Sequence, residues 1–190
     1  MIKAKNTYWI ADCMTAESII TKEVVTTIIG NELNYLGEYP TTLVSIWGTD
    51  YIPAWPFLHP RAFVGKFDDC TYAVQGYVPP TRAQVAALLN AGNNLPEGDV
   101  LVHCAAGISR SSAIVAGLLA MANRKDVLPR LVEVGQKSAS QCLKSPGIHP
   151  NACIIHYVDE LLGFNGDLFD TFEAAWPRAY RDFREHTGKA

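Results

Sequence analysis

The sequence has few charged residues and no long apolar segment. Asp, Glu, Lys and Arg make up 18% of its 190 residues, the net charge is -3, and the basic residues form no cluster. A basic surface for nucleic acid is therefore not expected. Residues 1–17 interrupt their apolar positions too often for a secretory signal or a membrane span. We therefore expect a cytoplasmic protein with no membrane partner.

The cysteines lack the pattern of a disulfide framework or a zinc site. They are odd in number, and none forms a CxxC pair: Cys13, Cys70, Cys104, Cys142 and Cys153. Disulfide-stapled domains have even numbers of cysteines, and structural zinc sites use closely spaced pairs. We therefore expect reduced thiols, no metal and no cofactor.

The length and apolar content are those of one ordinary domain. Hydrophobic residues make up 48% of the chain, which is enough to bury a sizeable core, and no internal repeat or long linker is evident. We expect a monomer with a single domain over residues 1–190. Its core would occupy about residues 7–163, and a helical C-terminal extension about residues 164–190.

Strand patterns alternate with helix patterns along the chain. We predict strands at residues 7–11, 42–47, about 62–67 and 100–104, and helices at about residues 16–29, 82–91, 111–122, 127–141, 151–162 and 168–186. Thr15 is the predicted cap of the first helix, Thr81 and Gln84 have capping-box spacing, and Pro177 marks the start of a helix or a break. The aromatic and proline-rich residues 48–60 predict an ordered loop without a helix. Such alternation indicates an α/β fold with a central, mostly parallel sheet flanked by helices.

The segment HCAAGISRS, residues 103–111, lies between an apolar strand and an apolar helix. Ligands of α/β sheets bind at this position, where the helix N-terminus attracts anions. Five residues separate Cys104 from Arg110, so the backbone can curl and aim several amides at one anion, and Gly107 permits the tight turn. The amides and the guanidinium would favour a thiolate at Cys104, and Arg110 can bind a phosphate through two parallel hydrogen bonds.

This segment resembles the active-site loop of the protein tyrosine phosphatase superfamily, in its small dual-specificity branch. The resemblance implies a cysteine-phosphatase fold in which Cys104 attacks phosphorus and Arg110 binds the phosphate. It also implies that Ser111 assists breakdown of the phosphocysteine and that His103 tunes the cysteine. The phosphate-binding loop would comprise Ala105, Ala106, Gly107, Ile108, Ser109 and Arg110.

The same resemblance requires a general acid upstream of the cysteine. FDDC at residues 67–70 fits, because Asp69 lies 35 residues before Cys104 and FDD resembles the acid loop of the phosphatases of regenerating liver. Asp69 is the favoured acid and Asp68 is the alternative. HPN at residues 149–151 resembles the Pro-Asn that begins a late helix in dual-specificity phosphatases, so the resemblance extends over about residues 60–162.

The expected substrate is a phosphorylated protein, carrying phosphotyrosine or else phosphoserine or phosphothreonine, or a small aryl phosphate. A phosphoinositide or nucleic-acid 5′-phosphatase is an alternative that the loop disfavours. Phosphoinositide-cleaving relatives place lysines in this loop, whereas residues 105, 106 and 108 are Ala, Ala and Ile. A rhodanese-like sulfurtransferase and a non-catalytic phosphate-binding module are further alternatives.

Two other features have a structural and a functional interpretation. Four aromatic residues in and before the proline-rich loop could line the mouth of the site, although packing onto the core is the favoured interpretation: Trp47, Tyr51, Trp55 and Phe57. Cys70 could pair with Cys104 on oxidation, but an inert buried thiol is the favoured interpretation.

Overall fold

The computed structural model describes residues 7–20, 27–29, 32–34, 39–93, 95–122 and 148–189. Its central sheet has four strands in the order β1-β6-β4-β5, and all three pairings are parallel. The strands are β1 (Thr7–Ala11), β4 (Thr42–Trp47), β5 (Ala62–Lys66) and β6 (Asp99–His103). The predicted α/β fold with a parallel central sheet is confirmed, and the carboxyl ends of all four strands lie at one edge.

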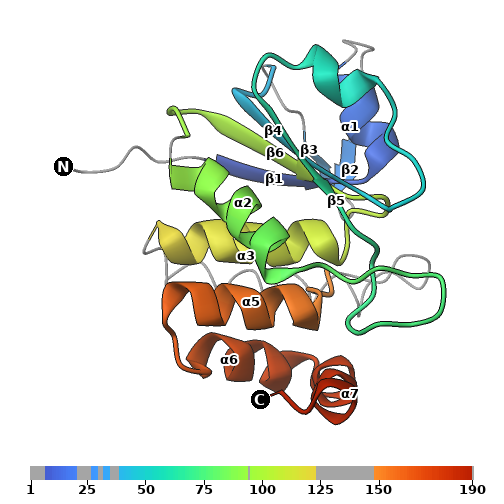
Figure 1. Ribbon diagram of the computed structural model, residues 1–190. Helices are drawn as coiled ribbons and strands as arrows, with labels where there is room; N and C mark the ends of the chain where they lie inside the picture. The colour runs from blue at the N-terminus through green and yellow to red at the C-terminus, as the bar shows by residue number, and fades with distance from the viewer. Residues whose placement is uncertain are drawn as a thin grey trace.

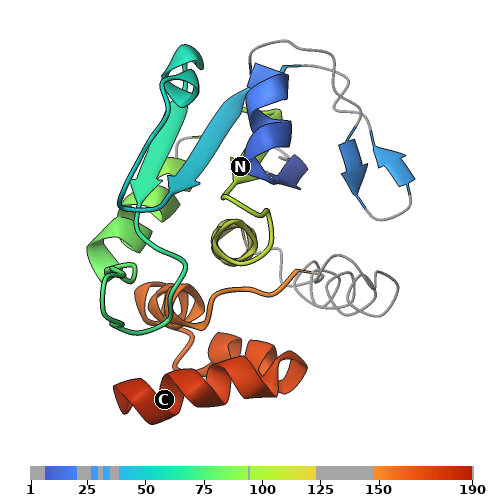
Figure 2. The ribbon, with the colours of Figure 1, turned by 90° about the vertical axis from the view of Figure 1, so that its right-hand side faces the viewer.

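Helices cover both faces of this sheet (Figures 1 and 2). One face carries α1 (Cys13–Ile20) and the short 3-10 helix η1 (Trp55–Leu58), which pack together. The other face carries α2 (Arg82–Asn93) and α3 (Arg110–Met121), with α5 (Ala152–Leu162) beneath them. The last layer contains α6 (Asp167–Ala175) and α7 (Pro177–Thr187), whose buried rings join the same apolar cluster as α3 and α5.

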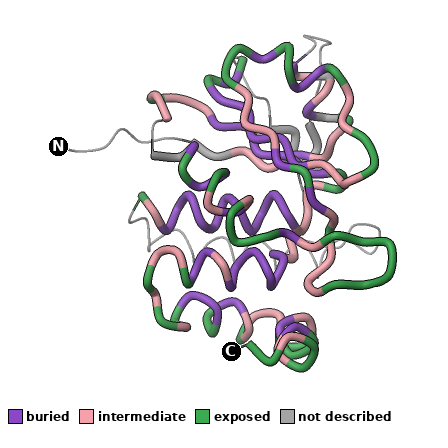
Figure 3. The backbone as a smooth tube through the Cα atoms, viewed as in Figure 1, coloured by how far each residue is buried: buried purple, intermediate pink, exposed green. Residues whose placement is uncertain are grey.

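Burial along β6 explains its continuous apolar sequence. Val100 and Val102 pack into the cluster on the α3 face, whereas Leu101 packs into the cluster on the α1 face. Successive side chains of a strand point to opposite faces, so the middle of a strand covered on both sides is apolar at consecutive positions. Figure 3 shows the result as a buried band through the central strands and α3. A Cβ atom at Gly117 would lie 2.6 Å from a Leu89 methyl carbon, so the missing side chain lets α3 approach α2 closely.

Several local signals in the sequence have the predicted geometry. The Thr81 amide donates to Gln84 Oε1 at 2.9 Å and the Gln84 amide donates to Thr81 Oγ1 at 3.3 Å, which is a capping box at the start of α2. Asn151 caps α5, which ends at Gly163 with a left-handed φ of 70°. Pro177 is the first residue of α7, after a break that follows α6.

The first predicted helix and the predicted proline-rich loop differ from the structure. The helix predicted over residues 16–29 is wrong at both ends, because α1 starts at Cys13, with Thr15 inside it, and Thr27–Ile29 forms strand β2. This strand pairs antiparallel with β3 (Glu32–Asn34), as the β-branched residues of this stretch favour. The loop predicted over residues 48–60 contains η1, with a proline in its first turn, where no amide donor is needed. The helix predicted at 127–141 lies outside the described residues.

Within the described ranges, no helix combines the length and the apolar character that a membrane crossing requires.

Candidate active site

The loop between β6 and α3 packs against the junction of β1 and α1. Gly107 has a φ of 68°, and a Cβ atom there would lie 2.7 Å from the backbone of Ala11 and Asp12. The Cys13 amide donates to the Ala105 carbonyl at 3.2 Å. Any larger residue at position 107 would therefore be both strained and obstructed, and the predicted need for glycine in this turn has a direct cause.

Cys104 lies at the base of this loop, directly after β6. It has no exposed surface, and its Sγ atom is 3.3 Å from the hydroxyl oxygen of Ser111. Ser111 belongs to the first turn of α3, where the backbone N–H groups carry partial positive charge. The Ser111 hydroxyl can therefore donate a hydrogen bond to the Cys104 thiolate. The partial positive charge of the helix N-terminus also stabilises this thiolate.

Arg110, the first residue of α3, brings a buried guanidinium to the same loop. Its side chain is 6% exposed, and Nη1 donates to the Phe67 carbonyl at 2.9 Å. Its buried Nε atom has no hydrogen-bond partner among the described residues, although Asp69 Oδ2 lies 3.9 Å away. Buried donors are normally paired, so this N–H is available for an anion that enters the loop.

Asp69 is connected to the loop by two hydrogen bonds. Its Oδ1 atom accepts from the Ser109 hydroxyl at 2.7 Å and from the Asn151 side-chain amide at 3.0 Å. The predicted acid, the predicted phosphate loop and the start of α5 therefore meet at one place. Asn151 was predicted only as the start of a helix, and its contact with Asp69 is an addition from the structure.

Asp68 is hydrogen-bonded to a different set of groups. Its carboxylate accepts hydrogen bonds from the Val78 amide at 2.7 Å and from the amide and hydroxyl of Thr49, both at 2.9 Å. The hydrogen bonds from the Val78 and Thr49 amides lower the pKa of Asp68. A lowered pKa favours the ionised carboxylate, which has no proton to donate. Asp68 is therefore suited to holding the two ends of the loop of residues 68–78 together and not to general acid catalysis.

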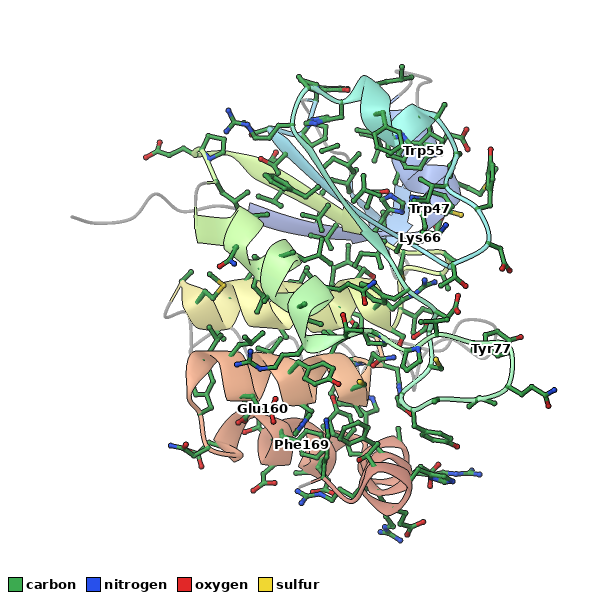
Figure 4. The ribbon with its side chains drawn as sticks, viewed as in Figure 1. Trp47, Trp55, Lys66, Tyr77, Glu160 and Phe169 are labelled. Carbon is green, nitrogen blue, oxygen red and sulfur yellow. The ribbon has the colours of Figure 1, made fainter. Side chains whose placement is uncertain are left out.

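His103 lies behind the loop, on the α1 face of the sheet. Its Nε2 atom is 2.7 Å from the Ser45 hydroxyl, and its ring contacts Trp47 and Trp55 at centroid distances of 5.4 and 5.0 Å. Burial lowers the pKa of His103 to about 4, so the ring is neutral at neutral pH. Figure 4 shows Trp47 and Trp55 close together near the end of β4.

The four aromatic residues of the 47–58 segment differ in how far they are buried. Trp55 is buried and Trp47 half-buried, and both pack with the α1-face cluster as predicted. Tyr51 and Phe57 are 69% and 65% exposed, so the favoured prediction that they pack on the core is wrong. The alternation of apolar residues with Gly and Pro in this loop does not indicate which rings face inward.

Cys70 is a free, half-exposed thiol beside the acid loop. Burial raises the pKa of Cys70, and the nearby carboxylates of Asp68 and Asp69 act in the same direction. These effects favour the protonated thiol, in the direction of the predicted inertness, but the predicted burial is wrong because the residue is half-exposed.

Comparison with known families places the chain in a class of phosphatases. The family model described as "DSP-PTPase phosphatase fused to NAD+ Kinase" matches residues 41–150, which are more than half of the chain and include both the acid loop and the cysteine loop. The chain therefore belongs to this family, within the dual-specificity branch of the protein tyrosine phosphatase superfamily. The predicted resemblance to that branch is confirmed.

A solved structure titled "Crystal Structure of PTPMT1 in complex with PI(5)P" is a more distant match. It has a TM-score of 0.45 and 15% sequence identity, over 88% of this chain and 93% of that chain. No curated protein matches the chain.

Proposed function

We propose that this chain is a cysteine-dependent protein phosphatase that hydrolyses phosphotyrosine through a phosphocysteine at Cys104. Phosphoserine, phosphothreonine and small aryl phosphates are further substrates of the same chemistry. The observation that carries the proposal is the meeting of four groups at one loop. They are the Cys104 sulfur, the Ser111 hydroxyl, the Asp69 carboxyl group, and the Arg110 Nε atom, which has no hydrogen-bond partner among the described residues.

In the first step, the Cys104 thiolate attacks phosphorus. A sulfur–phosphorus bond forms as the bond from phosphorus to the ester oxygen breaks. Arg110 and the loop amides bind the phosphoryl oxygens, and the Nε–H of Arg110, which lacks a hydrogen-bond partner in the described ranges, gains an acceptor. Asp69 donates its proton to the leaving oxygen, so a tyrosine departs as neutral phenol.

In the second step, a water molecule attacks the phosphocysteine. Asp69, now a carboxylate, accepts a proton from that water as the new phosphorus–oxygen bond forms. The sulfur–phosphorus bond breaks and returns the thiolate, and the Ser111 hydroxyl 3.3 Å from the sulfur donates a hydrogen bond to it. Inorganic phosphate then leaves.

The loop surface supports a substrate with one phosphate. Ala105 and Ala106 are exposed and Ile108 is half-buried, so these positions present no cation to a second phosphate group. Headgroups with several phosphates are expected to bind better where additional lysines or arginines are present. We therefore rank phosphoinositides below phosphotyrosine.

NADP+ is a second candidate substrate. The family description pairs this phosphatase with an NAD+ kinase, an enzyme that adds a phosphate monoester to NAD+. A cysteine phosphatase acts on phosphate monoesters, so removal of that group would reverse the kinase reaction. NADP+ is a small-molecule substrate, and its dephosphorylation can be measured in the same assays as that of phosphopeptides.

The proposal is tested with para-nitrophenyl phosphate in the presence of EDTA. We expect turnover by the wild-type chain, none by Cys104→Ser, and near wild-type turnover by Cys153→Ala, which removes a buried thiol from α5. A panel of phosphotyrosine, phosphoserine and phosphothreonine peptides, phosphoinositides and NADP+ then ranks the substrates. Turnover by Cys104→Ser, or dependence on a divalent metal, would contradict the mechanism.

A thiolate nucleophile works only where thiols stay reduced. The described cysteines are all free, and this supports action in a reducing compartment such as the cytoplasm. We also propose that the chain is a monomer. Fractionation of the source cells and light scattering of the purified chain test these two points.

A further inference from the structure

A chain of hydrogen bonds runs between the two central strands, behind the phosphate loop. Ser45 on β4 pairs in register with His103 on β6, so their side chains point to the same face. The Trp47 indole nitrogen is 2.6 Å from Ser45 Oγ, which is 2.7 Å from His103 Nε2. Ser45 and His103 have no exposed surface, so bulk water does not compete for these bonds.

The direction of the protons in this chain follows from what each group can donate. An indole N–H only donates, so Ser45 Oγ is the acceptor of the bond from Trp47. The hydroxyl hydrogen of Ser45 is then available for donation to His103 Nε2, which lies 2.7 Å from Ser45 Oγ. A neutral imidazole that accepts at Nε2 carries its proton at Nδ1.

The groups around the His103 ring favour its neutral form, with the single proton on Nδ1. Burial is the dominant effect and lowers the pKa of His103 to about 4, with Arg110 acting in the same direction. The peptide of Cys104 and the carboxylate of Asp12 act in the opposite direction and favour a protonated ring. Nδ1 itself is buried and has no hydrogen-bond partner in the described part of the chain. The Cys104 peptide is the backbone group whose interaction with the ring raises the pKa of His103.

We infer that Ser45 and Trp47 are positioning residues, whose hydrogen bonds fix His103 as the Nδ1–H tautomer and so hold the Cys104 peptide in place for attack on phosphorus. The inference rests on the proposed function, which supplies the reaction that this arrangement serves. Neither residue touches the substrate, and both act through His103.

The tautomer is measured directly by long-range proton–nitrogen correlation NMR on the full chain with labelled histidines. His103→Gln assigns the signal. We expect the Nδ1–H pattern in the wild-type chain and its loss or mixing with the Nε2–H pattern in Ser45→Ala and Trp47→Phe. Thr42→Val is the matched control, because Thr42 is a fully buried residue of the same strand and its hydroxyl has no hydrogen-bond partner among the described residues.

The same variants are compared in turnover of para-nitrophenyl phosphate. Ser45→Ala removes the hydrogen bonds to both Trp47 and His103, and loss of the bond to His103 is expected to lower kcat/KM by about five- to tenfold. Thr42→Val is expected to lower kcat/KM by less than about twofold. An Nε2–H tautomer in the wild-type chain would overturn the inference, as would equal rates in Ser45→Ala and Thr42→Val. Failure of the proposed function is distinguishable, because it appears as absent turnover in the wild-type chain itself.

Discussion

The sharpest functional prediction concerns Asp69→Asn. The asparagine keeps the size of the side chain and keeps an oxygen that can accept from Ser109 and Asn151, which bond to Asp69 at 2.7 and 3.0 Å. It removes the acidic proton and the charge 3.9 Å from Arg110 Nε. The variant therefore tests proton donation with little disturbance of the loop.

The size of the effect depends on the leaving group. General acid catalysis contributes about 10² to 10⁴ in rate when the departing oxygen needs a proton. The phenol of tyrosine has a pKa of about 10, so phosphotyrosine requires that proton and its turnover should fall by this factor. Para-nitrophenolate is a stable anion without a proton, so its release should fall by less than about tenfold.

The assay compares kcat/KM for a phosphotyrosine peptide and for para-nitrophenyl phosphate across pH. Asp69→Asn should also lose the decline in activity at high pH, which reflects loss of the acid proton in the wild-type chain. An equal fall for both substrates would refute the assignment of Asp69 as the acid and would leave it a structural role only.

Three further outcomes are expected. Asp68→Asn should slow both substrates by a similar factor, because it loosens the 68–78 loop. Hydrogen bonding lowers the pKa of Asp68, so the wild-type chain should lose this anchoring as the pH falls below the carboxyl group's ordinary value of 3.8, while the asparagine variant should show no such trend. Because burial lowers the pKa of His103 from 6.5 to about 4, the unfolded chain binds protons first, and unfolding free energy should fall by up to about 3 kcal/mol from pH 6.5 to pH 4 and by less in His103→Gln. Asp159→Ala should lower the melting temperature and cost about 2 kcal/mol, since the buried carboxylate accepts from three amides at the start of α6, whereas Glu97→Ala on the surface should have little effect. Denaturant unfolding monitored by circular dichroism measures both stability effects. A pH dependence of the unfolding free energy in His103→Gln equal to that of the wild-type chain would contradict the first, and an unfolding free energy of Asp159→Ala equal to that of the wild-type chain would contradict the second.

The predictions from sequence succeeded where the determinant is local. The spacing of Cys104, Gly107 and Arg110 places all three in one short turn between a strand and a helix, and the structure keeps them there. The capping box at Thr81 and Gln84 likewise depends on four consecutive residues. Such short sequence patterns predict local structure well, because few other conformations satisfy the same backbone hydrogen bonds.

The contacts that were not predicted join segments far apart in the chain. Asn151 reaches Asp69 across 82 residues, and Ser45 reaches His103 across 58 residues. Neither pairing follows from the periodicity of its own segment, because each requires the strand order and register of the sheet. The helix predicted through residues 27–29 failed for a related reason, since pairing with β3 decides between helix and strand for a β-branched segment.

The most direct test of the proposed chemistry is capture of the covalent intermediate. Acid quenching of the wild-type chain during turnover of para-nitrophenyl phosphate, followed by peptide mass spectrometry, should identify a phosphoryl group on Cys104. The Cys104→Ser variant should give no such thiophosphate adduct. A phosphoryl group on Cys70, or steady turnover with no adduct at any cysteine, would contradict the account.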